Sequence, residues 1–132
     1  MQRQSKILVI DDDPDFVSAT KAVLENKYQV ITAYNGDDGL KKVVDEKPDL
    51  IILDVIMPGK DGFTVCKELK EDPRYYFFSK IPVLLLTVFP HGIEETSVSL
   101  SAGANTEADG YVQKPVEPVE LLRQAEELLK AL

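Results

Sequence analysis

The chain has 132 residues, a length that fits one compact domain, and 44% of them are hydrophobic, which is enough for a core. Acidic side chains outnumber basic ones by 23 to 15, and the net charge of −8 disfavours non-specific binding to nucleic acid or to an anionic membrane. One cysteine, Cys66, allows no disulfide within the chain and fits a reducing compartment, and the apolar runs are too short for a signal peptide or a membrane-spanning helix, so we expect a cytoplasmic protein without membrane insertion.

Strand and helix patterns alternate from the N-terminus. Residues 6–10 form a β-branched, almost unbroken apolar run, which is typical of a strand buried on both faces. Asp13 as N-cap and Pro14 in the first helical position then begin a helix whose apolar residues recur at helical spacing up to Leu24. The next predicted elements are a strand over 29–34 and a helix over 37–46.

The alternation continues to the end of the chain. Further strands are predicted over 49–53, 81–86 and 110–113, and further helices over 63–70 (with Asp61 as N-cap), 93–102 and 118–132. Five strand–helix units in sequence imply a doubly wound α/β fold with a parallel sheet. We expect a single domain over 1–132, with its core at about 6–131, and no output domain in this chain.

Charged or hydroxyl side chains stand where four of the five predicted strands end. The first strand runs into the acidic residues 11–13, the third into Asp54, the fourth into Thr87 and the fifth into Lys114. Ligands of open parallel sheets bind beyond the carboxyl ends of the strands. These groups, some of them about a hundred residues apart, should therefore meet at one edge of the sheet.

The predicted cluster suits a cation and a phosphoryl group. Asp54 follows an apolar strand, and crowded carboxylates cannot all stay ionised without a cation beside them. Oxygen ligands of this kind suit Mg²⁺, which takes few protein carboxylates and keeps several waters. With Lys114 and Thr87 opposite, Asp54 is placed to act as a nucleophile and form an aspartyl phosphate.

Four motifs together resemble a known family. LVIDDD at 8–13, LDVIMPGKDG at 53–62, LLLT at 84–87 and GYVQKP at 110–115 occur in the order and spacing of the receiver domain of two-component response regulators, and the resemblance covers essentially the whole chain. It implies the flavodoxin-like (βα)5 fold with strand order 2-1-3-4-5.

The resemblance also implies roles for individual residues. Asp54 would be the phosphoacceptor, Asp12 would bind Mg²⁺ directly and Asp11 largely through water, and the backbone carbonyl of Ile56 would be a third protein ligand, with Asp54 completing the metal site.

Three further residues resemble the phosphoryl-binding and switch positions of the family, the switch being Thr87 and Tyr111. Thr87 would contact the phosphoryl group, Lys114 would pair with it, and Tyr111 would turn inward as Thr87 moves. The peptide bond between Lys114 and Pro115 would be cis.

The resemblance further implies partners. The phosphodonor would be a phosphohistidine on a sensor histidine kinase or a histidine phosphotransfer protein, and the domain would catalyse only its own phosphorylation and dephosphorylation. The face of the fourth helix, fifth strand and fifth helix would report the state to an effector protein, with a phosphorylation-dependent homodimer as a further expectation and no direct contact with nucleic acid.

Several positions depart from the family pattern. Val88 follows Thr87 where a small residue is usual, and Phe89 begins a bulky loop that includes His91, so access to the phosphoryl group could be narrower. Extra residues stand at 105–108. The segment 72–80 is longer than usual and carries the aromatic run at 75–78, for which local packing is favoured over a partner site unless its rings are exposed.

Two other functions compete with the phosphorylation switch. One is a receiver fold that no longer switches and serves as a phosphorylation-independent docking module, an alternative that Val88 and the altered loops keep open. The other is a haloacid-dehalogenase-like phosphatase, since Asp11 and Asp13 have the Asp-x-Asp spacing, although the glycine and threonine pattern of that class is absent. Each of three site residues also has an ordinary structural explanation when it is taken alone. Thr87 would be a strand-end hydroxyl, Lys114 a surface charge and Tyr111 a core residue.

Overall fold

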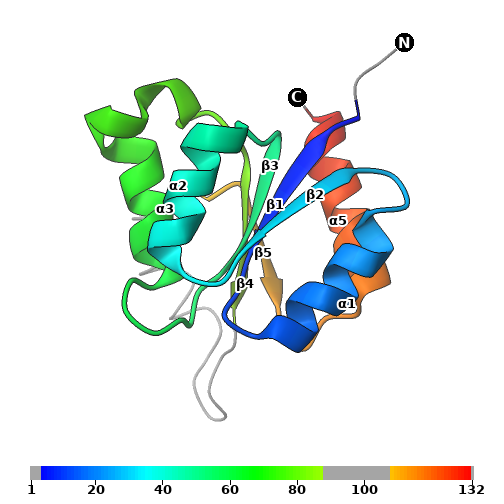
Figure 1. Ribbon diagram of the computed structural model, residues 1–132. Coiled ribbons are helices and arrows are strands. Elements are labelled where there is room, and N and C mark those ends of the chain that lie inside the picture. The colour runs from blue at the N-terminus through cyan, green and yellow to red at the C-terminus, as the bar shows by residue number, and fades with distance from the viewer. Residues whose placement is uncertain (1–3, 88–107, 132) are drawn as a thin grey trace.

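The computed structural model describes residues 4–87 and 108–131, and these form an α/β domain around one parallel sheet (Figure 1). The strand order is β2-β1-β3-β4-β5, which confirms the predicted fold class. The strands are β1 (Lys6–Ile10), β2 (Gln29–Ala33), β3 (Leu50–Asp54), β4 (Val83–Thr87) and β5 (Gly110–Gln113).

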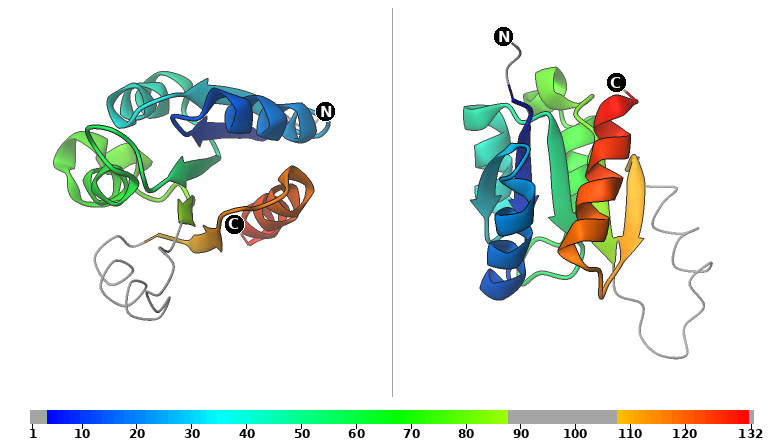
Figure 2. Two further views of the ribbon diagram at one scale, coloured as in Figure 1. Left: turned by 90° about the horizontal axis from the view of Figure 1, so that it is seen from below. Right: turned by 90° about the vertical axis from the view of Figure 1, so that its right-hand side faces the viewer.

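Helices cover both faces of the sheet. The described helices are α1 (Pro14–Leu24), α2 (Gly36–Glu46), α3 (Gly62–Glu71) and α5 (Pro118–Lys130), together with the 3-10 helix η1 (Pro73–Phe78). Figure 2 shows α1 and α5 side by side on one face, while α2 and α3 lie on the other. The predicted helix over 93–102 and the residues Val88, Phe89, His91 and 105–107 lie outside the described residues.

Alternating side chains of the central strands build one apolar cluster on each face. In β1, Leu8 and Ile10 point into the cluster under α2 and α3, whereas Ile7 and Val9 point into the cluster under α1 and α5. β3 and β4 alternate in the same way, and their residues are almost completely buried. The unbroken apolar runs read from the sequence are therefore explained by burial on both faces.

Helix caps confirm most of the predicted boundaries. The Asp13 carboxylate accepts hydrogen bonds from the backbone N–H groups of Asp15 and Phe16, and Asp61 caps α3 by accepting one from Thr64. α2 begins at Gly36, one residue before the prediction, because the Asn35 side chain caps it. Cys66 is completely buried, as expected of a structural thiol.

Two strands end one residue later than predicted, and each added residue is a candidate site residue. β3 runs over Leu50–Asp54 instead of 49–53, and β4 runs over Val83–Thr87 instead of 81–86. Asp54 and Thr87 are thus the last residues of their strands and not loop residues. Ladder pairing between β3 and β4 reaches Asp54 opposite Leu86, which fixes the backbone of Asp54.

The helix η1 is not predicted from the sequence. Asp72 caps it by accepting a hydrogen bond from the Arg74 N–H, and Pro73 occupies its first turn. Its aromatic run divides: Tyr75 and Phe78 pack against the core, whereas Tyr76 and Phe77 are 72% and 90% exposed. The prediction of local packing is right for half of the run and wrong for the other half.

No helix among residues 4–87 and 108–131 combines the length and the apolar character needed to cross a membrane.

Candidate functional site

Three carboxylates meet at the carboxyl edge of the sheet, as the order of the motifs predicts. Asp11 follows β1 and is completely buried, Asp54 ends β3 and is 4% exposed, and Asp12 is exposed. Each offers an oxygen atom within 4.8 Å of those of the other two. The donor set consists of oxygen atoms only, from three carboxyl groups, which is the chemistry that a hard divalent cation requires.

Lys114 brings a positive charge into this cluster from the other end of the chain. Its Nζ atom donates a hydrogen bond to Asp11 Oδ2 at 2.6 Å and lies 3.4 Å from Asp54 Oδ1. The lysine backbone is fixed as well, since its N–H donates to the carbonyl oxygen of Thr87 at 2.7 Å. The Lys114–Pro115 peptide bond is cis, as predicted.

The surroundings of Asp54 oppose its ionisation. Burial, with the nearby Asp11 charge as the next cause, raises the pKa of the Asp54 carboxyl from 3.8 to about 6, against the lowering effect of Lys114. A second cation beside Asp54 would favour the ionised form, so the site is suited to one.

The loop after β3 is held tightly against the Asp54 backbone. The Gly62 N–H donates to the Val55 carbonyl oxygen at 2.8 Å, and a Cβ atom at Gly62 would lie 2.3 Å from the carbonyl oxygen of Asp54. Only glycine fits here. Within this loop Gly59 has a positive φ of 77°, and the Ile56 side chain is 60% exposed.

The other predicted site residues lie on β4 and β5. Thr87 is 5% exposed at the end of β4, next to Lys114 in the backbone ladder. Tyr111 lies on β5 opposite Leu85 and is 42% exposed, so its ring does not belong to the apolar core. The roles given to Val88 and Phe89 concern residues outside the described part of the chain.

One contact at the site was missed in the sequence. The Lys114 Nζ atom lies 4.3 Å from the centroid of the Phe16 ring, in the first turn of α1. From the sequence, Phe16 is only one of the apolar residues that recur at helical spacing in that helix. The signal was its place in the turn that follows the acidic residues 11–13, but no spacing rule connects it with Lys114.

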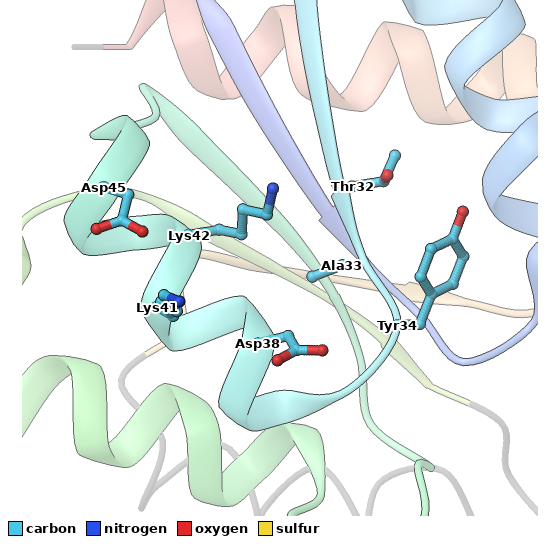
Figure 3. Close-up of a pocket in the computed structure, with 7 residues that line it drawn as sticks. All are labelled: Thr32, Ala33, Tyr34, Asp38, Lys41, Lys42 and Asp45. Atoms are coloured by element: carbon cyan, nitrogen blue, oxygen red, sulfur yellow. The ribbon is translucent and has the colours of Figure 1, made fainter.

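A separate pocket lies at the outer edge of the sheet, between β2 and α2 (Figure 3). Its lining combines two carboxylates with two ammonium groups, and none of its polar side chains is buried; the residues are Thr32, Ala33, Tyr34, Asp38, Lys41, Lys42 and Asp45. Such a mixture favours no particular class of ligand.

Comparison with known proteins agrees with the geometry of the carboxyl edge. Residues 7–126 match the profile of the response regulator receiver domain. The chain belongs to this family. Receiver domains are the phosphoacceptor switches of two-component systems, and phosphorylation of an aspartate is a property of the family.

Individual receiver domains show the extent of the similarity. The alkaline phosphatase synthesis transcriptional regulatory protein PhoP of Bacillus subtilis is 37% identical over 95% of this chain and 48% of its own length. The signal receiver domain of a histidine kinase from Syntrophus aciditrophicus has a TM-score of 0.81 at 32% identity, over 97% of this chain and 92% of that one. The beryllofluoride-activated receiver domain of DrrB, an OmpR/PhoB homologue of Thermotoga maritima, has a TM-score of 0.77 at 30% identity, over 97% and 99% of the two chains.

The chain spans about half the length of the curated relatives that it matches, as the share of PhoP illustrates.

Proposed function

We propose that this receiver domain accepts a phosphoryl group on Asp54 from a phosphohistidine and thereby changes its affinity for an effector protein. The observation that carries the proposal is the convergence of three carboxylates within 4.8 Å of one another with the Lys114 ammonium 3.4 Å from Asp54. No other described cluster of His, Cys, Asp and Glu offers such a donor set.

In the phosphorylation step, an Asp54 carboxylate oxygen attacks the phosphorus atom of the phosphohistidine. The P–N bond breaks, the electron pair leaves with the imidazole, and the imidazole takes up a proton from the solvent. The product is an acyl phosphate on Asp54. In hydrolysis a water attacks the same phosphorus, the P–O bond to Asp54 breaks, and inorganic phosphate leaves. Both steps are catalysed by the domain itself, which turns over no substrate other than its phosphodonor.

The remaining residues stabilise the charge of the transferred group. The Lys114 ammonium would pair with one phosphoryl oxygen, and the Thr87 hydroxyl would donate a hydrogen bond to another. Mg²⁺, held by Asp11, Asp12, Asp54 and the backbone carbonyl of Ile56, would neutralise phosphoryl oxygens when bound.

The partners follow from the same scheme. The donor would be a sensor histidine kinase or a histidine phosphotransfer protein in the cytoplasm. The readout would involve residues 93–102, β5 and α5, with Thr87 and Tyr111 linking the site to that face, and an effector or a second receiver domain would bind there.

Beryllofluoride tests the proposal, because it mimics an aspartyl phosphoryl group and activates the DrrB receiver domain. We expect binding that requires Mg²⁺ in the wild type and is lost in Asp54→Asn. Asp45→Asn, which changes an exposed carboxylate on α2, is the matched control and should bind like the wild type. Absence of binding in the wild type would contradict the proposal and favour a docking module that does not depend on phosphorylation.

A further inference from the structure

The Lys114 ammonium is enclosed on three sides. Asp11 Oδ2 accepts its hydrogen bond at 2.6 Å, Asp54 Oδ1 lies at 3.4 Å, and the centroid of the Phe16 ring lies at 4.3 Å. The lysine side chain is only 17% exposed. An aromatic face attracts an ammonium group through its quadrupole, and the attraction grows where water is partly excluded.

The ring is itself held in place. Phe16 lies in the first turn of α1, where its backbone N–H is capped by the Asp13 carboxylate, and its side chain packs against the apolar cluster under α1 and α5. The N–H of Asp13 in turn donates to Asp11 Oδ1 at 3.0 Å. One local structure therefore positions both the ring and the carboxylate that face Lys114.

The two carboxylates compete for the ammonium. Nζ lies closer to Asp11 than to Asp54. A divalent cation bound to the acidic cluster would neutralise part of the Asp11 charge and weaken its attraction for Nζ. Because a lysine has a flexible four-carbon stem, the side chain could then turn toward solvent. An open groove lined by Asp13, Phe16, Pro115 and Val116 lies beside Lys114 and leaves room for such a movement.

We propose that Phe16 is a positioning residue that keeps the Lys114 ammonium beside Asp54 when Asp11 is engaged by a cation. This inference rests on the proposed function of Asp54 and Lys114. The ring acts through the ammonium, which lies 4.3 Å from its centroid. It stabilises the position of Nζ beside Asp54, where the ammonium would pair with a phosphoryl oxygen.

The first test compares ligand affinities of Phe16→Leu and Phe16→Tyr with the wild type. Leucine keeps the apolar contact and removes the π face, so beryllofluoride binding in Mg²⁺ should weaken about threefold to thirtyfold. Tyrosine keeps the π face and should restore wild-type binding. The affinity for Mg²⁺ alone should not fall in either variant, because the carboxylates hold the ion. Phe78→Leu, the same change in a partly buried ring of the other apolar cluster, is the control.

Three results would overturn the inference while leaving the proposed function intact. They are unchanged beryllofluoride affinity in Phe16→Leu, an equal loss in Phe16→Tyr, and a parallel loss of Mg²⁺ affinity, which would indicate a general distortion of the site. Phe16→Met replaces Phe16→Leu if the latter populates unfolded protein.

The second test uses no ligand and so separates the inference from the function. Urea unfolding of Phe16→Leu, Lys114→Met and the double variant forms a double-mutant cycle. A coupling factor of about threefold or more in the unfolding equilibrium constant supports the contact, and a factor near one overturns it. A wild type that binds no beryllofluoride would refute the proposed function, and this cycle would still decide whether the ring holds the ammonium.

Discussion

Asp54 combines a position required by the proposed chemistry with surroundings that oppose its charge. It is almost completely buried, and the Asp11 carboxylate lies close by. The Lys114 ammonium is shared between the two acids and lies nearer to Asp11. A carboxylate that folding makes harder to ionise lowers the stability of the folded state at neutral pH, in the absence of a cation.

This gives a pH dependence with a definite sign. The Asp54 pKa is 3.8 as a reference and about 6 in the folded protein. Between these values the folded state retains a proton that the unfolded chain has lost, so the free energy of unfolding should fall as the pH rises from 4 to 6. We expect Asp54→Asn to remove this fall, which makes the variant more stable than the wild type at pH 7 by about 1–3 kcal/mol.

Urea unfolding at several pH values in a chelating buffer measures the effect. Asp45→Asn should keep the wild-type profile, because it changes an exposed carboxylate. Parallel profiles of the wild type and Asp54→Asn would contradict the argument.

Thr20 carries a further buried polar group. It is completely buried on α1, and its hydroxyl is, among the described residues, a buried side-chain group without a hydrogen-bond partner. Replacing it by valine keeps the shape and removes the desolvated hydroxyl, so Thr20→Val should raise the free energy of unfolding by about 1 kcal/mol. Thermal unfolding checks this against Thr64→Val on the exposed face of α3, and a loss of stability in Thr20→Val would show that the hydroxyl has a partner.

Among the secondary-structure elements, the segment between α3 and β4 is held in place by the side chain of one lysine, Lys70. Lys70 has a side chain only 8% exposed, and its Nζ donates to the carbonyl oxygens of Ser79 and Ile81 at 2.9 and 2.7 Å. It also lies 3.4 Å from the Asp109 carboxylate, which accepts the Val83 N–H and so joins β4 to the start of β5.

Lys70→Met should therefore loosen this segment. Methionine retains the apolar stem but leaves carbonyl oxygens without their donor, at an expected loss of about 2–3 kcal/mol in the free energy of unfolding. Lys67→Met, on the exposed face of the same helix, should change it by less than about 0.5 kcal/mol. Urea unfolding measures both, and faster amide exchange at residues 79–83 would place the effect. Equal stability of the two variants would contradict the anchoring role.

The segment between α3 and β4 also contains η1, a helix that could not be predicted from the sequence. Helices α1 and α3 could be predicted because Asp13 and Asp61 are caps followed by a helical apolar period. The helix η1 has only six residues, and its core-facing pair, Tyr75 and Phe78, lies on either side of two equally aromatic residues that face solvent, so its short i, i+3 period does not stand out in the sequence. Asp72 followed by Pro73 is a pattern typical of a helix start, but the aromatic residues that follow it do not form a recognisable amphipathic helix in the sequence.

For the whole molecule, the candidate site could be predicted because topology alone brings it together. Parallel strands that all end at one edge place Asp11, Asp54 and Lys114 next to one another whatever the loops do. The sequence could not tell that the Lys114 ammonium lies nearer to Asp11 than to Asp54, nor that it lies over the Phe16 ring. Both contacts depend on the side-chain geometry of elements that are far apart in the chain, and a periodic sequence pattern does not predict such contacts.

Crowding of negative charge in a chain of net charge −8 leads to a prediction for the molecule as a whole. A cation that binds only the folded state raises stability by mass action, whereas salt in general only screens the repulsion. We expect Mg²⁺ at about ten to a hundred times its dissociation constant to raise the free energy of unfolding by about 1.4–2.7 kcal/mol, beyond the effect of NaCl at equal ionic strength.

The acidic cluster should account for that difference. Asp12→Asn removes an exposed ligand without opening the core, so its thermal unfolding should respond to MgCl₂ and NaCl alike, while Asp45→Asn should retain the wild-type response. If Asp12→Asn kept the full Mg²⁺ effect, the ion would be acting on the diffuse charge of the chain and not at the carboxyl edge. Loss of the effect in Asp12→Asn alone would place the cation beside Asp54, where the charge of a phosphoryl group would have to be neutralised.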